Sequence, residues 1–199
     1  MAKKINPYRR GISKRDIVDE LLEWGDSFAI ALFVVLLIMI FAFRQVQVSG
    51  SSMQTTLYDK DRILISNFLG KIGQGDIVVV NSEGLNKTVV KRVIATEGQT
   101  VEIDYEKDTV SVDGKILDES YLGITSKDMV NFSFYDKSYW VEEDGVYRYV
   151  VPEGTLFLLG DNRNNSTDSR SSSVGFVPTE QVLGKAVLRI FPFTQITTL

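Results

Sequence analysis

Serine and lysine are the residues of this sequence best suited to covalent chemistry, because two more common choices are missing. The 199 residues include no histidine and no cysteine. The chain therefore has no thiol nucleophile, no disulfide, no Cys-ligated zinc site and no imidazole general base. This composition excludes hydrolases of the Ser-His-Asp type and zinc hydrolases. Acid–base chemistry is left to Asp, Glu, Lys, Tyr or Ser.

A serine-rich segment, residues 48–57 with the sequence VSGSSMQTTL, holds candidate nucleophiles. Taken alone, such a run after a long apolar segment is most often a flexible connector. Met53 and Leu57 are apolar, however, and a strand pattern follows at once, so we expect the segment to pack. A serine hydroxyl is a weak nucleophile until a base takes its proton. The segment therefore needs a basic partner from elsewhere in the chain.

Lys91 is the lysine whose surroundings best suit a general base. It lies in the apolar run Thr88–Ala95, whereas most other lysines lie in polar stretches. An ordinary lysine has a pKa near 10.4, and burial among apolar groups can lower this value by about 3 units. In a strand, either Lys91 or Arg92 must face the interior, because successive side chains alternate. An edge strand whose lysine reaches water fits the same pattern, and both interpretations stay open at this level.

A third polar segment, residues 160–170 with the sequence GDNRNNSTDSR, follows the apolar run Thr155–Leu159. Its density of Gly, Asx and Ser predicts an irregular loop. Paired Asp and Arg side chains and hydroxyls suit the fixing of a neighbouring catalytic group by hydrogen bonds and ion pairs. A solvated surface turn is the alternative. The interspersed arginines and the absence of EF-hand spacing argue against a calcium loop.

The sequence around these segments predicts a mainly β protein. Beyond residue 48, short β-branched runs alternate with turns. Asp113-Gly114 is a two-residue hairpin signal. The region 118–149 is rich in aromatics and charges, and we expect a small variable lobe inserted within about residues 102–150, with the aromatics forming its core. The predicted strands are Arg62–Ser66, Asp76–Asn81, Thr88–Ala95, Thr100–Asp104, Thr109–Val112, Lys115–Leu117, Thr155–Leu159 and Val182–Phe191.

One apolar segment, Ser27–Phe43, runs for 17 residues without a charge. As a helix it is about 25 Å long, slightly short of a bilayer core of about 30 Å. Trp24, Val46 and Val48 can extend its apolar surface. A buried core helix and a cleaved secretory signal are the alternatives, the latter with a weak cleavage site at residues 48–50. We expect a retained, single transmembrane helix.

The charges beside this helix predict its orientation. Residues 1–26 contain six Lys and Arg residues, and the first nineteen residues after the helix contain three. The positive-inside rule therefore places residues 1–26 in the cytoplasm and residues 44–199 outside, in a single-pass protein of the cell membrane. The formal net charge is −4, so binding of nucleic acid through bulk charge is not expected.

These segments, in this order after an amino-terminal span, resemble the bacterial type I signal peptidases of the prokaryotic, Gram-positive kind. The nucleophile box of that family, G-x-S-M-x-P-T-L, corresponds to residues 50–57, and its G-D-I-V-V box to residues 75–79. The general-base box K-R-V stands at residues 91–93. The G-D-N-R-x-x-S-x-D-S-R box is matched in full by residues 160–170, and G-F-V-P follows at 175–178. The last of these boxes is specific, and the ordered set is strong.

The resemblance implies a membrane-bound serine endopeptidase that removes amino-terminal signal peptides from exported preproteins. It implies a signal-peptidase β-sheet core, cleavage after sites such as Ala-x-Ala, and no metal or organic cofactor. The expected partners are the signal peptides of secreted preproteins and the lipid bilayer, with substrates met at the secretion channel.

Carried over by position, the resemblance makes Ser52 the nucleophile and Lys91 the general base. The Ser52 backbone N–H would form part of the oxyanion hole. Gly50 stands where some members supply a second, serine donor to that hole. The resemblance further implies that Ser166 orients the lysine ammonium. Arg92, Asp168 and Arg170 would form an ion-pair network beneath the site.

Three residues depart from the family pattern: Thr55 replaces a usual proline, Gln99 an aspartate and Ala95 a glycine. Thr55 is expected to loosen the placement of the nucleophile and so to alter rate or specificity rather than abolish activity. An alternative function is a silent or narrowly dedicated signal-peptidase-like protein that assists surface pilus assembly. The presence of both Ser52 and Lys91 argues against it. Self-cleaving repressors of related fold carry a DNA-binding domain where this chain has a membrane span.

Overall fold

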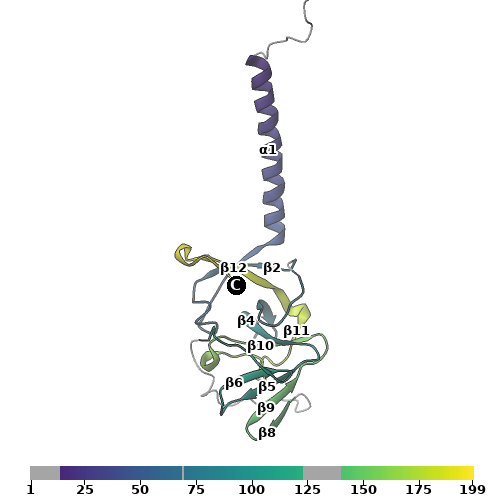
Figure 1. The fold of residues 1–199 in the computed structure, drawn as a ribbon, viewed down its shortest axis with the longest axis vertical. Helices are drawn as coiled ribbons and strands as arrows, with labels where there is room; N and C mark the ends of the chain where they lie inside the picture. The colour runs from purple at the N-terminus through teal and green to yellow at the C-terminus, as the bar shows by residue number, and fades with distance from the viewer. Residues whose placement is uncertain (1–13, 69, 123–139) are drawn as a thin grey trace, which may run out of the picture. The chain divides into compact units, whose positions relative to one another are not determined.

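The computed structural model describes residues 14–68, 70–122 and 140–199. The chain divides into two compact units between Ala42 and Phe43, one helical and one built of β-sheets. Figure 1 shows both units and the order of their elements.

The helical unit contains α1, Lys14–Ala42. Its part from Glu20 to Ala42 has 23 residues; the most apolar stretch of this part has a mean hydropathy of 2.5, and none of that stretch is buried within the protein. At 1.5 Å per residue this part is about 35 Å long, enough to cross a bilayer core of about 30 Å. The helix begins before the predicted apolar segment because the polar residues ahead of Ser27 are also good helix formers.

The larger sheet has eight strands, with the order β1-β2-β12-β3-β4-β10-β11 and β13 paired to β12. All of its pairs are antiparallel. β3 is the most continuously buried strand, as expected for an apolar run in the middle of a sheet. The strands are β1 (Arg44–Gln47), β2 (Arg62–Ser66), β3 (Ile77–Ser82), β4 (Lys87–Thr96), β10 (Thr155–Leu159), β11 (Val177–Pro178), β12 (Val182–Phe191) and β13 (Thr197–Thr198).

The smaller sheet has five strands in the order β7-β6-β5-β9-β8. The predicted hairpin at Asp113-Gly114 is confirmed: it joins β6 to β7, and both residues have positive φ, 51° and 75°. Such values suit a two-residue hairpin turn. The strands are β5 (Thr100–Asp104), β6 (Thr109–Val112), β7 (Lys115–Ile116), β8 (Trp140–Glu143) and β9 (Val146–Val150).

Part of the region predicted as an inserted lobe belongs to this smaller sheet. β8 and β9 form a hairpin, and β9 pairs with β5 along its whole length. Tyr149 is fully buried against Phe157 of β10, with ring centroids 5.0 Å apart. This aromatic is therefore core rather than ligand site. Four other aromatic residues of region 118–149 for which the same prediction was made lie outside the described residues: Phe132, Phe134, Tyr135 and Tyr139.

Two buried clusters matter for the site. One contains Ile94 of β4, Val101 of β5 and Phe157 of β10, and so packs the two sheets together. A second contains Met53 and Leu57 together with residues of β2, β3 and β12. Burying a side chain of this size contributes about 1.5–3 kcal/mol. The serine-rich segment is therefore packed into the core, and the flexible-connector interpretation is wrong.

Candidate active site

β4 carries Lys91 at the point where one of its neighbouring strands ends. β3 pairs with β4 through this region, with Val78 opposite Lys91, whereas the pairing with β10 stops at Leu159 opposite Arg92. The chain leaves the sheet there as the predicted polar loop, residues 160–170. β4 is therefore an interior strand with one side open from Lys91 back to Lys87. Lys91 is nevertheless buried, so the interpretation in which it reaches water from a strand edge is wrong.

Lys91 and Ser52 are in direct contact. The Lys91 side chain is buried, with 2% of the residue exposed. Its Nζ lies 2.8 Å from the Ser52 Oγ and donates a hydrogen bond to it. Two residues 39 positions apart in the sequence are thus held at the distance that proton transfer requires.

The loop that carries Ser52 is fixed by the polar loop after β10. The Asn162 backbone N–H donates to the Ser52 carbonyl over 2.9 Å, and the Asn162 side chain donates to the Ser51 carbonyl over 3.1 Å. Gly160 is needed for this approach, since a Cβ there would lie 2.5 Å from the Ser52 carbonyl oxygen. On the other side, Met53 and Leu57 anchor the loop in the core.

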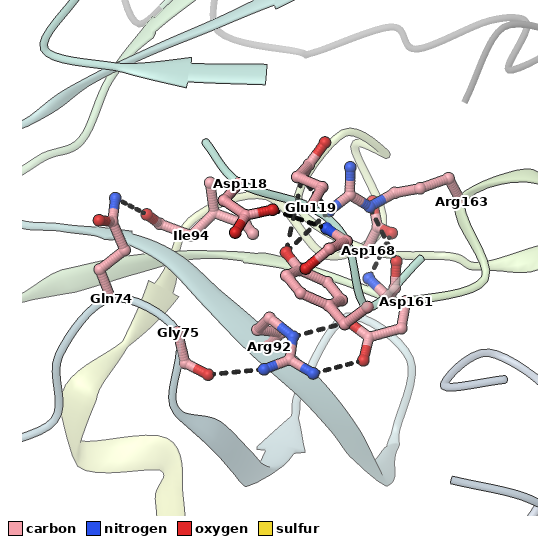
Figure 2. Close-up of polar contacts among 12 residues, drawn as sticks. Gln74, Gly75, Arg92, Ile94, Asp118, Glu119, Asp161, Arg163 and Asp168 are labelled. Carbon is pink, nitrogen blue, oxygen red and sulfur yellow. Dashed lines mark hydrogen bonds and ion pairs between the residues drawn. The ribbon is translucent and has the colours of Figure 1, made fainter. Parts of the chain in front are cut away.

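The predicted ion-pair network is present as two separate pairs rather than one. Asp168 and Arg170 pair with each other at 2.7 Å, both almost completely buried. Arg92 instead pairs with Asp161, with its Nε 2.9 Å and a terminal nitrogen 2.7 Å from the two carboxylate oxygens. Figure 2 shows Arg92 lying between Asp161 and the Gly75 carbonyl. Asp161 received no role from the sequence, although it stands within the matched G-D-N-R box.

Gly50 and Ser166 are the two remaining supporting residues, and their roles stay predictions. The Gly50 backbone has φ of +93°, which favours glycine, and its N–H donates to the Asp59 carboxylate over 3.0 Å. The Ser166 Oγ is buried beside Gly160. No hydrogen bond joins Ser166 to Lys91 in the described parts of the chain, so its orienting role stays a prediction.

Two of the three departures from the family pattern, Gln99 and Ala95, lie away from Ser52. Gln99 holds the turn after β4, accepting a hydrogen bond from the Thr96 N–H and donating one to Asp113. Ala95 is fully buried in the core between the sheets. Within residues 14–68, 70–122 and 140–199, no cluster of three or more carboxylates is placed to hold a metal ion.

The surroundings of Lys91 make it a better base than an ordinary lysine. Burial is the main cause and lowers its pKa from 10.5 to about 8. The positive charges of Lys87 and Arg170 lower the pKa further, while Asp168 and Asp161 oppose this effect. Near pH 8 about half of the Lys91 side chains are therefore neutral and able to accept a proton.

This lowered pKa has a measurable cost in stability. Below pH 8 the folded protein holds a buried ammonium, and between pH 8 and 10.5 the unfolded chain binds the proton while the folded one does not. The cost is therefore full below pH 8 and disappears as the pH rises to 10.5. We expect Lys91→Met to raise the free energy of unfolding at pH 7 by up to about 3 kcal/mol.

Thermal unfolding of wild type and Lys91→Met in the same detergent, at pH 7 and pH 10, measures this effect. The variant should unfold at the higher temperature at pH 7, and the difference should shrink at pH 10. A variant that is equally or less stable at pH 7 would show that Lys91 is not buried as a charged group.

A cleft of about 500 Å³ opens beside the Ser52–Lys91 pair. One wall is the segment from Val46 to Met53, and the other is the open edge of β4 from Lys87 to Lys91. Asn165 and Thr167 lie at the end formed by the polar loop. An extended peptide laid in this cleft would bring a backbone carbonyl past the Ser52 hydroxyl.

Known proteins resemble this chain over most of its length. The family model described as "Signal peptidase, peptidase S26" matches residues 21–191. Signal peptidase I T of Bacillus subtilis is 36% identical over 87% of this chain and 87% of its own length. Signal peptidase IB of Staphylococcus aureus is 34% identical over 88% of this chain and 92% of its own length.

The chain belongs to the signal peptidase family, peptidase S26. It is a serine endopeptidase that removes signal peptides from secreted preproteins. A solved signal peptidase I from Enterococcus faecalis is 34% identical, covering 58% of this chain and 97% of that chain with a TM-score of 0.42. The peptidase function agrees with the resemblance found in the sequence boxes and disagrees with a catalytically silent protein, whereas the narrowly dedicated alternative stays a hypothesis.

Proposed function

We propose that Ser52 is the nucleophile and Lys91 the general base of signal peptide cleavage. The observation that carries this assignment is the 2.8 Å contact between the buried Lys91 Nζ and the Ser52 Oγ, in the wall of the cleft. The lowered pKa of Lys91 supports it, because a neutral amine is needed to accept the serine proton. No histidine is present in the sequence to do this instead.

The reaction proceeds in two halves. Neutral Lys91 takes the Ser52 proton while Oγ attacks the scissile carbonyl, and the resulting ammonium then protonates the leaving amine. This leaves an ester between Ser52 and the signal peptide. Lys91 next takes a proton from water, the oxygen of that water attacks the ester, and the proton returns to Ser52.

The negative oxygen of each tetrahedral intermediate needs a donor. The Ser52 N–H is suited to this, since no hydrogen bond uses it in the part of the chain that the structure describes. The Gly50 N–H already donates to Asp59. We therefore assign the Ser52 N–H as the oxyanion donor contributed by the nucleophile loop.

The cleft walls favour small apolar substrate side chains. Four valines line the cleft and offer shallow apolar contacts: Val46, Val48, Val89 and Val90. Cleavage sites of the Ala-x-Ala kind fit such a surface. The test is cleavage of a preprotein carrying this site by the full-length protein in detergent, with Ser52 or Lys91 replaced one at a time. Cleavage that survives either replacement would remove that residue from the mechanism.

We further propose that α1 anchors the protein in the membrane with residues 1–26 in the cytoplasm and residues 44–199 outside. The six positive charges before the helix, against three after it, support this orientation. Substrates emerge from the secretion channel on the outer side, with their apolar segments still in the bilayer. Ser52 follows the end of α1 by ten residues in the sequence, which suits a substrate presented at that surface.

Single cysteines test this topology, because the natural chain has none. We expect a membrane-impermeant maleimide to label Lys115→Cys in intact cells, since Lys115 is exposed on β7. Ser13→Cys should be labelled only after lysis. The reverse pattern would contradict the orientation.

A further inference from the structure

The residues that begin the inserted region, Asp118 to Leu122, lie against the residue that follows the general base. The Tyr121 ring faces the Arg92 guanidinium, whose central carbon lies 4.0 Å from the ring centroid. Arg92 is largely buried and also pairs with the buried Asp161. A cation over an aromatic face is attracted more strongly where water is excluded. Tyr121 therefore helps to hold Arg92 in place next to Lys91.

The same tyrosine also binds the nucleophile loop. The Thr55 hydroxyl donates a hydrogen bond of 2.9 Å to the Tyr121 backbone carbonyl, across 66 residues of sequence. Thr55 lies three residues after Ser52 and stands where the family usually has proline. The neighbouring Thr56 hydroxyl donates to Asp161, the partner of Arg92. The loop is thus hydrogen-bonded both to Tyr121 and to Asp161, the partner of Arg92.

The segment around Tyr121 is itself held in place by an ion pair. Glu119, two residues earlier, forms an ion pair with Arg163 of the polar loop. Arg163 has only 1% of its surface exposed. Arg163 also donates to the Gly160 carbonyl over 3.1 Å, and Gly160 packs against the Ser52 carbonyl. Figure 2 shows Glu119 close to Arg163, and Arg92 with Asp161. The segment from Asp118 to Leu122 is therefore fixed to the same loop that holds Ser52.

We infer that Thr55 and Tyr121 are a pair of positioning residues for the Ser52 nucleophile, at the position where the family resemblance leads us to expect a proline. A proline fixes the backbone through its ring, whereas this chain fixes the loop by a hydrogen bond to the inserted region. The inference rests on the proposed role of Ser52 and Lys91. It gives the start of the inserted region a part in catalysis and explains how a threonine is accommodated here.

The first test compares Thr55→Val, which keeps the shape and loses the hydroxyl, with Thr55→Ser, which keeps the hydroxyl. Initial rates of preprotein cleavage over a range of substrate concentrations give kcat and KM separately. We expect Thr55→Val to lower kcat by about tenfold, since a misplaced nucleophile slows the chemical step. KM and the midpoint of the pH profile should stay unchanged, and Thr55→Ser should stay within about twofold of wild type. Equal kcat in Thr55→Val and wild type, or an equal fall in both variants, would overturn the inference.

The second test concerns the ring and guards against a variant that folds poorly. Tyr121→Phe keeps the ring over Arg92 and should stay within about twofold of wild type, whereas Tyr121→Leu should lose about tenfold in kcat. Because the two residues act on one loop, the double variant Thr55→Val with Tyr121→Leu should be little worse than either single change. A loss near the hundredfold product of two independent effects would show that they do not form a pair.

Ser52→Ala, measured in the same assay, separates this inference from the proposed function. If Ser52→Ala still cleaves, the nucleophile assignment fails, whatever Thr55 does. If Ser52→Ala is inactive and Thr55→Val matches wild type, the assignment stands and the positioning pair is refuted.

Discussion

Replacing Ser52 with alanine, or Lys91 with methionine, is expected to lower kcat/KM for preprotein cleavage by at least about 10⁴-fold. Ser52→Ala removes the oxygen that forms the ester. Lys91→Met keeps the length and apolar stem of the side chain but leaves Ser52 with no base at 2.8 Å. The described residues offer no second lysine in contact with the Ser52 hydroxyl.

Matched replacements in the smaller sheet control for the substitutions themselves. Ser111 on β6 and Lys115 on β7 lie outside the cleft, so Ser111→Ala and Lys115→Met should cleave like wild type. The measurement is the rate of appearance of mature protein over at least four orders of magnitude in enzyme concentration. Since the two site residues act as a unit, the double variant should be no slower than the slower single variant. Residual activity within a hundredfold of wild type in either single variant would contradict the assignment.

The second large effect is a dependence of rate on pH. The proposed role of Lys91 as the base, with a pKa of about 8, predicts that the fraction of active enzyme falls about tenfold for each pH unit well below that value. We expect kcat/KM to rise about fiftyfold from pH 6 to pH 8 and to level off above pH 9 at about twice its value at pH 8. An ordinary lysine would instead keep the rate rising to beyond pH 10. A profile that is flat between pH 6 and pH 8 would exclude Lys91 as the base.

Lys87 supplies a check on the origin of this profile. It lies on the same strand, and its positive charge lowers the pKa of Lys91. Lys87→Gln should therefore move the midpoint of the profile to higher pH. A shift of the midpoint to lower pH would contradict the assignment of the profile to Lys91, because removing a nearby positive charge raises the pKa of a lysine.

The strands with strong patterns could be predicted from the sequence, whereas the weak ones could not. Runs of β-branched residues such as those of β4 and β12 fall within a residue or so of their predicted limits. β1 has the polar sequence RQVQ, and β11 has only two residues, so neither has a usable pattern. β9 lies in a region predicted as a separate lobe, because its pairing with β5 depends on contacts that local sequence does not encode.

The same distinction holds for the site: what depends on neighbouring residues could be predicted from the sequence, whereas contacts between distant residues could not. Alternation along a strand indicated that either Lys91 or Arg92 faces inward, and the structure leaves 2% of Lys91 and 12% of the Arg92 side chain exposed. The predicted pairing of Arg92 was incomplete, because its true partner, Asp161, is 69 residues away. The contacts of Tyr121 with Thr55 and Arg92 also join distant parts of the chain, so no spacing rule could have found them.

The central claim is that a buried lysine becomes neutral near physiological pH beside the nucleophilic serine. The most direct measurement is the ¹⁵N chemical shift of the Lys91 Nζ, followed by NMR from pH 6 to pH 11 in the full-length protein labelled on lysine. Comparison with Lys91→Met identifies the signal. We predict that this signal titrates with a midpoint near pH 8, below the other lysines. A midpoint above pH 10 would contradict the account, because Lys91 would then remain charged while the enzyme works.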